Sequence, residues 1–307
     1  MHTDLMMNSN SVFARLERME DGTFATSYGP FVLQTALQPI FGEDANGILE
    51  LAAFEGLIRA KRNGEPVPPS QFFSMVTAAD MQTIDSLCRT LHILNTGLLN
   101  RRAAKLFVNF HPGLFLTLND IRHEVDRIAV ATREAGMRPE QIVCEITRKE
   151  NEDLRAITHF AASLRNLGFK IAVDEYGAQD SDAERVRILE PEFVKFETSW
   201  VLEFMNISTG SALLKVMVDQ FKERGITPIF EGLEDLAQVE LCQQLGVPLM
   251  QGYVLARPEI APTSFNQTYP EPFEPIRQTT APAVSRPASP TFGLAGRKNA
   301  SFGKRGV

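Results

Sequence analysis

Short apolar runs of strand length alternate with longer runs of helical spacing through the middle of the chain. The strand-like runs cover residues 32–40, 47–57, 105–108, 142–146, 170–173, 193–196, 226–230 and 249–254. Between most of them, apolar residues recur with helical spacing at 69–95, 120–135, 151–166, 181–189, 211–224 and 236–245. Such alternation is typical of repeated βα units around a parallel sheet. Eight strands of this kind predict a closed α/β barrel.

The first two strand-like runs depart from this scheme. They are joined by a polar turn from Gly42 to Gly47, which is too short for a crossover helix. The two runs are therefore expected to pair as an antiparallel hairpin. The predicted fold is a TIM-like (β/α)8 barrel with an antiparallel first strand.

The two ends of the chain lack the alternating pattern. Residues 1–30 are interpreted as an N-terminal extension, in which 11–19 could form one short amphipathic helix. Residues 31–262 carry the barrel pattern. Residues 263–307 are rich in Pro, Ser and Thr, a composition typical of disorder. The basic residues of this tail leave two interpretations open, contact with an anionic surface or a merely solvated tail.

Charge and cysteine usage exclude some classes of function. The chain of 307 residues has 31 Lys and Arg against 38 Asp and Glu, a net charge of −7, so it lacks the overall basic footprint of duplex nucleic-acid binders. Cys88, Cys144 and Cys242 form no CxxC pair, which argues against a disulfide framework or a zinc cluster. No apolar run approaches the roughly 18 residues of a membrane span, and the N-terminus lacks a signal-peptide layout. We expect a soluble, cytoplasmic protein.

Polar or ionisable residues occupy the ends of most predicted strands. In chain order they are Glu55, Asn109, Glu145, Asp174 with Glu175, Lys195, Glu231 and Gln251. The C-terminal ends of barrel strands converge on one face, so these side chains are expected to share one pocket. A helix N-cap is the commoner explanation for a single Asp after a strand. Caps do not explain Glu and Lys inside strands, where a buried charge is costly unless it is paired or bound to a metal.

The residue types in this set indicate the chemistry. Carboxylate and amide oxygens suit a hard cation such as Mg²⁺ or Mn²⁺, whereas zinc prefers His or Cys. Only His111 among the histidines comes near the set in sequence. Adjacent acids such as Asp174 and Glu175 could bridge to a second cation, and a nearby lysine could activate water or neutralise phosphate charge. This arrangement indicates metal-assisted phosphodiester hydrolysis.

Residues 36–258 resemble the EAL domain, a bacterial phosphodiesterase domain that hydrolyses cyclic di-GMP to the linear dinucleotide pGpG. The motifs that carry the resemblance follow the family order: Leu37-Gln-Pro-Ile40, Phe54-Glu-Gly-Leu-Ile-Arg59, Val108-Asn-Phe110, Cys144-Glu-Ile-Thr147, Val173-Asp-Glu-Tyr-Gly177, Val194-Lys-Phe-Glu197, Phe230-Glu-Gly-Leu-Glu234, Gln251-Gly-Tyr253 and Arg257-Pro258. The family's antiparallel first strand also agrees with the hairpin expected above.

The resemblance implies a role for each candidate residue. The ligands of a first metal would be Glu55, Asn109, Glu145 and Asp174, with Asp174 bridging to a second. The second metal or its water would be served by Glu175 and Glu231. Lys195 would help to activate the water, and Gln251 would support the site. The dinucleotide would be contacted by Gln38 and Arg59, the latter through a charge-assisted bond to phosphate. A homodimer is a further implication of the resemblance.

Several positions depart from the family pattern. Gly56 stands where the family has Ala, which keeps the neighbouring ligand Glu55. Glu175 replaces Asp and adds one methylene, which could displace a ligand by about an ångström and cost on the order of 100-fold in rate. The loop 177–182 is rewritten, Arg148 replaces a glutamate that usually anchors that loop, and Glu197 replaces Asp.

These departures leave more than one function open. The leading hypothesis is an active cyclic di-GMP phosphodiesterase, because every first-metal ligand and Lys195 are present. The alternative is a catalytically silent EAL domain that acts as a cyclic di-GMP receptor or binds a protein partner. An unrelated barrel metalloenzyme would require the ordered motif matches to be accidental.

Overall fold

The barrel is closed by strands whose positions follow the apolar runs of the sequence. The computed structural model describes residues 12–115, 117–147, 154–179 and 182–271. Within these ranges the barrel consists of eight strands: β3 (Phe31–Glu43), β4 (Leu49–Arg62), β6 (Lys105–Phe110), β7 (Ile142–Ile146), β8 (Lys170–Tyr176), β9 (Phe193–Phe196), β10 (Thr227–Leu233) and β11 (Leu249–Gly252). Neighbours pair in the order β3, β11, β10, β9, β8, β7, β6 and β4, and the pairing of β3 with β4 closes the ring.

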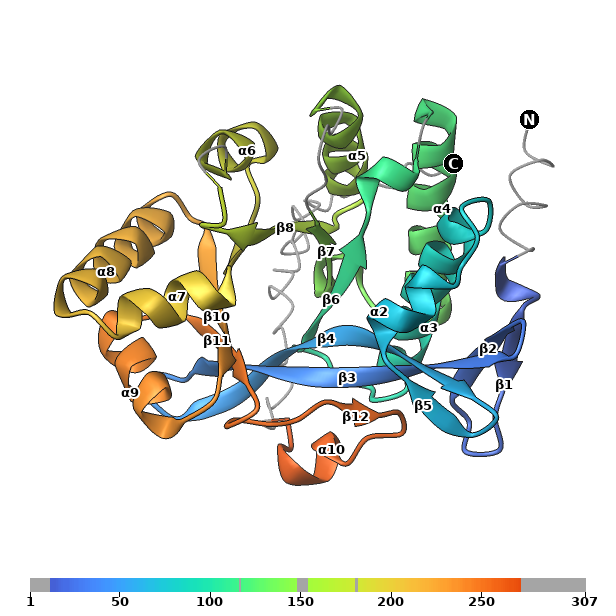
Figure 1. Cartoon of the computed structure of the whole chain (residues 1–307), viewed down its shortest axis with the longest axis horizontal. Helices are drawn as coiled ribbons and strands as arrows, with labels where there is room; N and C mark the ends of the chain where they lie inside the picture. The colour runs from blue at the N-terminus through green and yellow to red at the C-terminus, as the bar shows by residue number, and fades with distance from the viewer. Residues whose placement is uncertain (1–11, 116, 148–153, 180–181, 272–307) are drawn as a thin grey trace, which may run out of the picture. The chain divides into compact units, whose positions relative to one another are not determined.

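The direction of the first strand is as predicted. β3 runs antiparallel to both β4 and β11, whereas β4 and the strands that follow it around the barrel pair in parallel. The hairpin of β3 and β4 extends past the barrel, as Figure 1 shows, and there it pairs with β2 (Phe24–Tyr28) and β5 (Glu65–Val67). The prediction of an antiparallel first strand is confirmed.

Most helices lie close to the positions that the sequence predicts, and α7 (Thr198–Met205) is an additional helix. The helices longer than one turn are α2 (Pro69–Ser74), α3 (Met81–Gly97), α4 (Leu118–Glu134), α5 (Leu154–Asn166), α6 (Asp182–Leu189), α7, α8 (Ser208–Glu223) and α9 (Leu236–Leu245). The single helix expected over 69–95 is wrong, because the chain breaks between α2 and α3 at 75–80. α9 has the predicted bounds because Asp235 and Gln238 form a reciprocal capping box at its start.

The described part of the N-terminal extension, residues 12–30, contributes two strands to the sheet. The helix expected over 11–19 is wrong: Leu16–Arg18 is a strand, β1, which pairs with β2, and β2 pairs with β3. Apolar residues of this extended sheet pack against α2 and α3 in a second core that includes Phe31, Ile58 and Phe72. The extension therefore contributes buried surface to the fold.

The C-terminal boundary lies later than the sequence indicated. β12 (Glu259–Ile260) pairs with β3, and α10 (Phe265–Thr268) inserts Phe265 into the main core. Residues 263–271, which the composition assigns to the tail, are thus part of the folded structure. The remainder of that tail, 272–307, lies outside the described residues.

Two further expectations concern membranes and thiols. Among the described residues, no helix combines the length and apolar character needed to cross a bilayer. Cys88, Cys144 and Cys242 are free and buried, in agreement with the expectation of no disulfide framework.

Candidate active site

The inward-facing residues of the barrel strands form an apolar layer and, two residues further along each strand, a polar layer. One interior layer takes a single residue from each barrel strand: Ile40, Ala53, Phe107, Val143, Ala172, Phe193, Ile229 and the partly buried Leu249. Successive inward side chains on a strand are two residues apart. Moving two residues on from each gives the next inward layer: Glu55, Asn109, Glu145, Asp174, Lys195, Glu231 and Gln251. On antiparallel β3 the step runs backwards, from Ile40 to Gln38.

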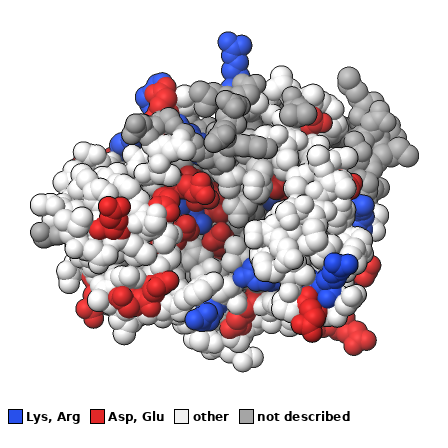
Figure 2. Space-filling view, in the orientation of Figure 1, with Lys and Arg blue, Asp and Glu red and all other residues white. Residues whose placement is uncertain are grey.

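This second layer, which we call the polar ring, places an ammonium among carboxylates. Lys195 Nζ lies 2.8 Å from Glu231 Oε2, 3.0 Å from Glu145 Oε1 and 3.2 Å from Glu55 Oε2. Gln251 Nε2 donates to the same Glu55 oxygen at 2.8 Å. In Figure 2, acidic side chains gather around a hollow near the middle of the face, with basic atoms between them. The structure therefore brings together candidates from β4, β7, β9, β10 and β11.

Burial and charge shift the pKa values of the ring. Burial opposes the charged form of Lys195, but the surrounding carboxylates, Glu145 first, raise its pKa well above the ordinary value. Burial raises the pKa of Glu145 and that of Glu231, although Lys195 opposes the shift in both. The charge of Asp174, a further member of the ring, acts on the same three groups. More carboxylates than cations meet here, so a further positive charge would be favoured.

The position of Asn109 in the ring is fixed through contacts of its backbone. It pairs with Glu145 in the parallel register of β6 and β7. Its carbonyl oxygen accepts a hydrogen bond of 3.0 Å from the buried guanidinium of Arg89 on α3. Arg89 is held in turn by Asp85 and by Glu124, which accepts from Arg89 Nε at 2.9 Å. The strand end that carries Asn109 is therefore fixed from outside the barrel by a buried ion network.

That network was missed in the sequence. Its signal was the pair Asp85 and Arg89, four residues apart, which are the only Asp, Glu, Lys or Arg residues of α3. Asp85 also accepts at 2.6 Å from Nδ1 of His111, a side chain that is half exposed just past Asn109. The position of His111 near the site is as noted from the sequence, but its contact is with this network.

Three other candidates lie outside the cluster of contacts. Gln38 pairs with Glu55 in the register of β3 and β4. Arg59 lies on the same side of β4 as Glu55, four residue pairs further along the hairpin, and donates to the carbonyl of Ile58. Glu175 is exposed on an irregular part of β8 with a left-handed backbone, φ 55°. The structure thus places Glu175 at the edge of the ring and not within it.

The ring suits a hard divalent cation by its donor chemistry. Its potential ligands are carboxylate and amide oxygens, which Mg²⁺ and Mn²⁺ prefer. Glu145 Oε2 and Gln251 Oε1 are buried and lack a hydrogen-bond partner among the described residues. In the same part of the chain, no three His, Cys, Asp or Glu side chains stand close enough to form a ready metal cage. The carboxylates instead converge on the ammonium of Lys195, so the donor types fit a cation while their present partner is a lysine.

Comparison with known proteins finds relatives and solved structures that resemble this chain. The probable cyclic di-GMP phosphodiesterase PdeA of Escherichia coli (strain K12) is 24% identical over 229 residues, covering 72% of this chain and 30% of PdeA. The chain thus spans less than a third of the length of that relative. The calcium/cyclic di-GMP complex of Klebsiella pneumoniae BlrP1 is 28% identical with a TM-score of 0.62, covering 76% of this chain and 56% of that chain.

A second structure of the same protein extends the comparison. The manganese/cyclic di-GMP complex of BlrP1 has a TM-score of 0.65 at 25% identity, covering 80% of this chain and 58% of that chain. The model of the EAL domain family matches residues 32–258, a span that includes every member of the polar ring and all of the barrel strands except the first residue of β3. The chain belongs to the EAL domain family.

Proposed function

We propose that this protein hydrolyses cyclic di-GMP to the linear dinucleotide pGpG with Mg²⁺ or Mn²⁺. The observation that carries the proposal is the polar ring, which places Lys195 within 3.2 Å of three carboxylates at one end of the barrel. Support also comes from relatives of the same family that are named as cyclic di-GMP phosphodiesterases or were solved with that nucleotide and a divalent cation.

We propose metal ligands from the polar ring and from Glu175 at its edge. We assign the first cation to Glu55, Asn109, Glu145 and Asp174, and a second to Asp174 and Glu175. Bound cations would polarise the scissile phosphate and lower the pKa of a coordinated water. The excess of carboxylates over cations in the ring supports this assignment, because a divalent ion relieves the repulsion between buried like charges.

The chain's own residues would orient and assist the reaction. An ammonium in contact with three carboxylates keeps its proton, so Lys195 would hold the ligands in place and neutralise phosphate charge rather than act as the base. Glu231 is the most exposed of these carboxylates, at 24% of its side-chain area. It is the one best placed to accept a proton from the attacking water.

Substrate contacts are assigned to the part of the hairpin beyond the ring. Gln38 pairs with Glu55 across β3 and β4, and Arg59 lies four residues further along β4 on the same side. Arg59 would bind a phosphate of the dinucleotide. Gln251 would hold Glu55 through the 2.8 Å bond from its side-chain amide.

A second candidate function is cyclic di-GMP binding without turnover. The observation that favours it is the position of Glu175, whose exposed carboxylate lies on a left-handed backbone at an irregularity of β8. Such a receptor would use the same face of the barrel and pass the signal to a protein partner. We also propose the reducing cytoplasm as the location, supported by three buried free thiols, and leave a homodimer as a proposal for sizing experiments.

The test is a turnover assay on the purified chain. Protein is incubated with cyclic di-GMP and either Mn²⁺ or Mg²⁺, and pGpG is quantified by liquid chromatography. Glu55→Gln should abolish product formation. Glu50→Gln is the matched control, because Glu50 is an exposed residue of the same strand outside the ring. Nucleotide binding by the wild type without product in either metal would contradict hydrolysis and support the receptor function.

A further inference from the structure

A second polar cavity lies at the other end of the barrel strands. It has a volume of about 430 Å³ and is lined by the ends of α3 and α4 and by the segment that leads into β6. Ala104 lies in its wall, directly before β6, whereas Asn109 of the polar ring lies near the end of that strand. A six-residue strand spans roughly 20 Å, so this basal cavity is remote from the candidate active site.

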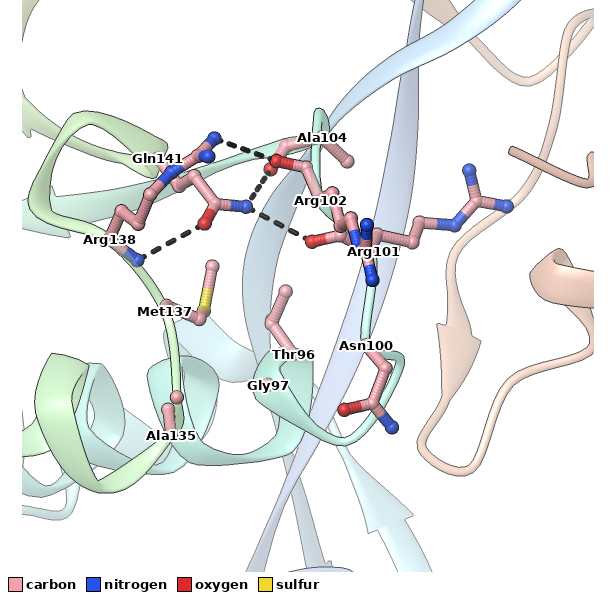
Figure 3. A pocket seen from close by; sticks show the side chains of 11 residues that line it. Thr96, Gly97, Asn100, Arg101, Arg102, Ala104, Ala135, Met137, Arg138 and Gln141 are labelled. Carbon is pink, nitrogen blue, oxygen red and sulfur yellow. Dashed lines mark hydrogen bonds between the residues drawn. The ribbon is translucent and has the colours of Figure 1, made fainter. Parts of the chain in front are cut away.

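The basal cavity is rich in positive charge. Arg101, Arg102 and Arg138 line it, and no acidic side chain is among its lining residues in the described part of the chain. Figure 3 shows Gln141 between Arg138 and the segment that carries the other two arginines, joined to both by hydrogen bonds. Thr96, Ala135 and Met137 add an apolar lining. Such a surface suits a small anion with an organic part.

The arginines are not simply capping the helices that end here. Arg101 donates to Asn266 Oδ1 and to two carbonyl oxygens of the α10 segment. Arg138 donates to the carbonyl of Arg102 at 2.8 Å. Over the described ranges, Arg102 and Arg138 form no salt bridge with an acid, and no guanidinium of the three binds a carbonyl of α3 or α4. Two guanidinium groups therefore keep donors available at the rim.

The same segment already binds an oxyanion. The carboxylate of Glu271 accepts from the backbone N–H of Arg102 at 2.9 Å and of Ala103 at 2.7 Å. Next to it, Lys105 is half buried and has no acidic partner among the residues that the structure describes. Burial lowers the pKa of Lys105, and the charges of Lys170 and Arg138 lower it further. Lys170 pairs with Glu192 at 3.3 Å, but Lys105, Arg102 and Arg138 have no acidic side-chain partner in the described ranges. Part of the positive charge at the base of the barrel is therefore not neutralised.

We propose that the basal cavity is a binding site for a small phosphate-bearing anion, held by Arg102 and Arg138. A phosphate would accept charge-assisted hydrogen bonds from both guanidinium groups, while its organic part would contact Met137 and Ala135. This site is separate from the polar ring, whose carboxylates repel anions when no metal is bound.

The test is a calorimetric titration, in which inorganic pyrophosphate is added to metal-free protein in the presence of EDTA. The expected result is saturable binding with one pyrophosphate per chain. Arg138→Gln and Arg102→Gln should each weaken binding by about tenfold, the effect of losing one charge-assisted bond. Arg133→Gln should leave the affinity for pyrophosphate unchanged. Arg133 lies in the last turn of α4, near the cavity, but its side chain is 74% exposed and does not line the cavity.

Two results would overturn the proposal. One is the absence of saturable binding to the wild type. The other is equal weakening by Arg133→Gln and Arg138→Gln, which would indicate general attraction to a basic surface. Because both rim arginines are exposed, the variants are expected to keep the wild-type melting temperature, which circular dichroism checks. The outcome is independent of the turnover assay, since no metal or cyclic di-GMP is present.

Discussion

The imidazole of His92 occupies the space that a side chain at Gly56 would need. A Cβ built on Gly56 would lie 2.7 Å from His92 Cγ and 2.8 Å from its Cβ. His92 is buried on α3 and its Nδ1 is 3.1 Å from the hydroxyl of Thr35 on β3. The glycine next to Glu55, where the family has alanine, is thus matched by a bulky neighbour on the helix behind β4.

This contact predicts that Gly56→Ala destabilises the fold. The added methyl group would force His92 or β4 to move, at a cost of about 1–3 kcal/mol in the free energy of unfolding. In a His92→Ala background the space is open, so the same substitution should cost much less. Urea unfolding of the four proteins of this double-mutant cycle measures the difference. An equal cost in both backgrounds would show that His92 is not the obstacle.

His92 also predicts a specific dependence of stability on pH. Burial lowers its pKa to about 3, with the charges of Arg89 and Arg59 adding to the shift. An unfolded histidine titrates near 6.5, so between about pH 6.5 and 3 the unfolded chain binds a proton that the folded chain does not. The free energy of unfolding therefore falls as the pH is lowered through this window.

The matching measurement compares the wild type with His92→Asn. From pH 7 to pH 5 the wild type should lose about 2 kcal/mol more than the variant, since one pKa unit corresponds to about 1.4 kcal/mol. Equal losses in the two proteins would mean that other groups cause the acid sensitivity.

Removing the ammonium from the polar ring should destabilise the metal-free protein. Lys195→Met leaves buried carboxylates without their partner, and breaking a buried ion pair typically costs about 3–5 kcal/mol. Thermal unfolding in EDTA measures the loss, and Mn²⁺ should recover more stability in the variant than in the wild type. Lys215→Met is the control, because Lys215 pairs with Asp219 on the surface of α8. A loss as small as that of the control would contradict the role given to Lys195.

Glu175 is expected to limit the rate of the proposed reaction. Glu175→Asp removes one methylene and restores the family residue at a left-handed position, where Asp is better tolerated than Glu. Steady-state assays should show kcat raised on the order of 10- to 100-fold. Glu190→Asp is the matched control, since Glu190 is also exposed with a left-handed backbone, φ 44°, but lies at the end of α6 away from the ring. An unchanged kcat would indicate that Glu175 does not limit the reaction.

Much of the barrel could be predicted because its strands combine a buried interior with a polar end. Glu145 and Lys195 stood out as charges inside apolar runs, and the two-residue step from the interior layer explains why they meet. The N-terminal hairpin was misread as a helix, although Asp21-Gly22 between β1 and β2 is a turn signal that could have been used.

Other features depend on contacts that no local pattern contains. The break between α2 and α3 has no Gly or Pro, so apolar periodicity continued through 75–80. The contact of Gly56 with His92 joins a strand to a helix far along the chain, and Arg89 meets the carbonyl of Asn109 only once the barrel has closed. Tertiary packing, rather than propensity, decides each of these.

Calorimetric titration with Mn²⁺ tests most directly whether the polar ring is a metal site. Wild-type protein should bind Mn²⁺ saturably, and Glu145→Gln should weaken the affinity at least about tenfold, as expected when a buried charged ligand becomes neutral. Glu50→Gln, on the exposed part of β4, should bind as the wild type does. Absence of saturable binding to the wild type, or equal affinities for the wild type and Glu145→Gln, would contradict the account.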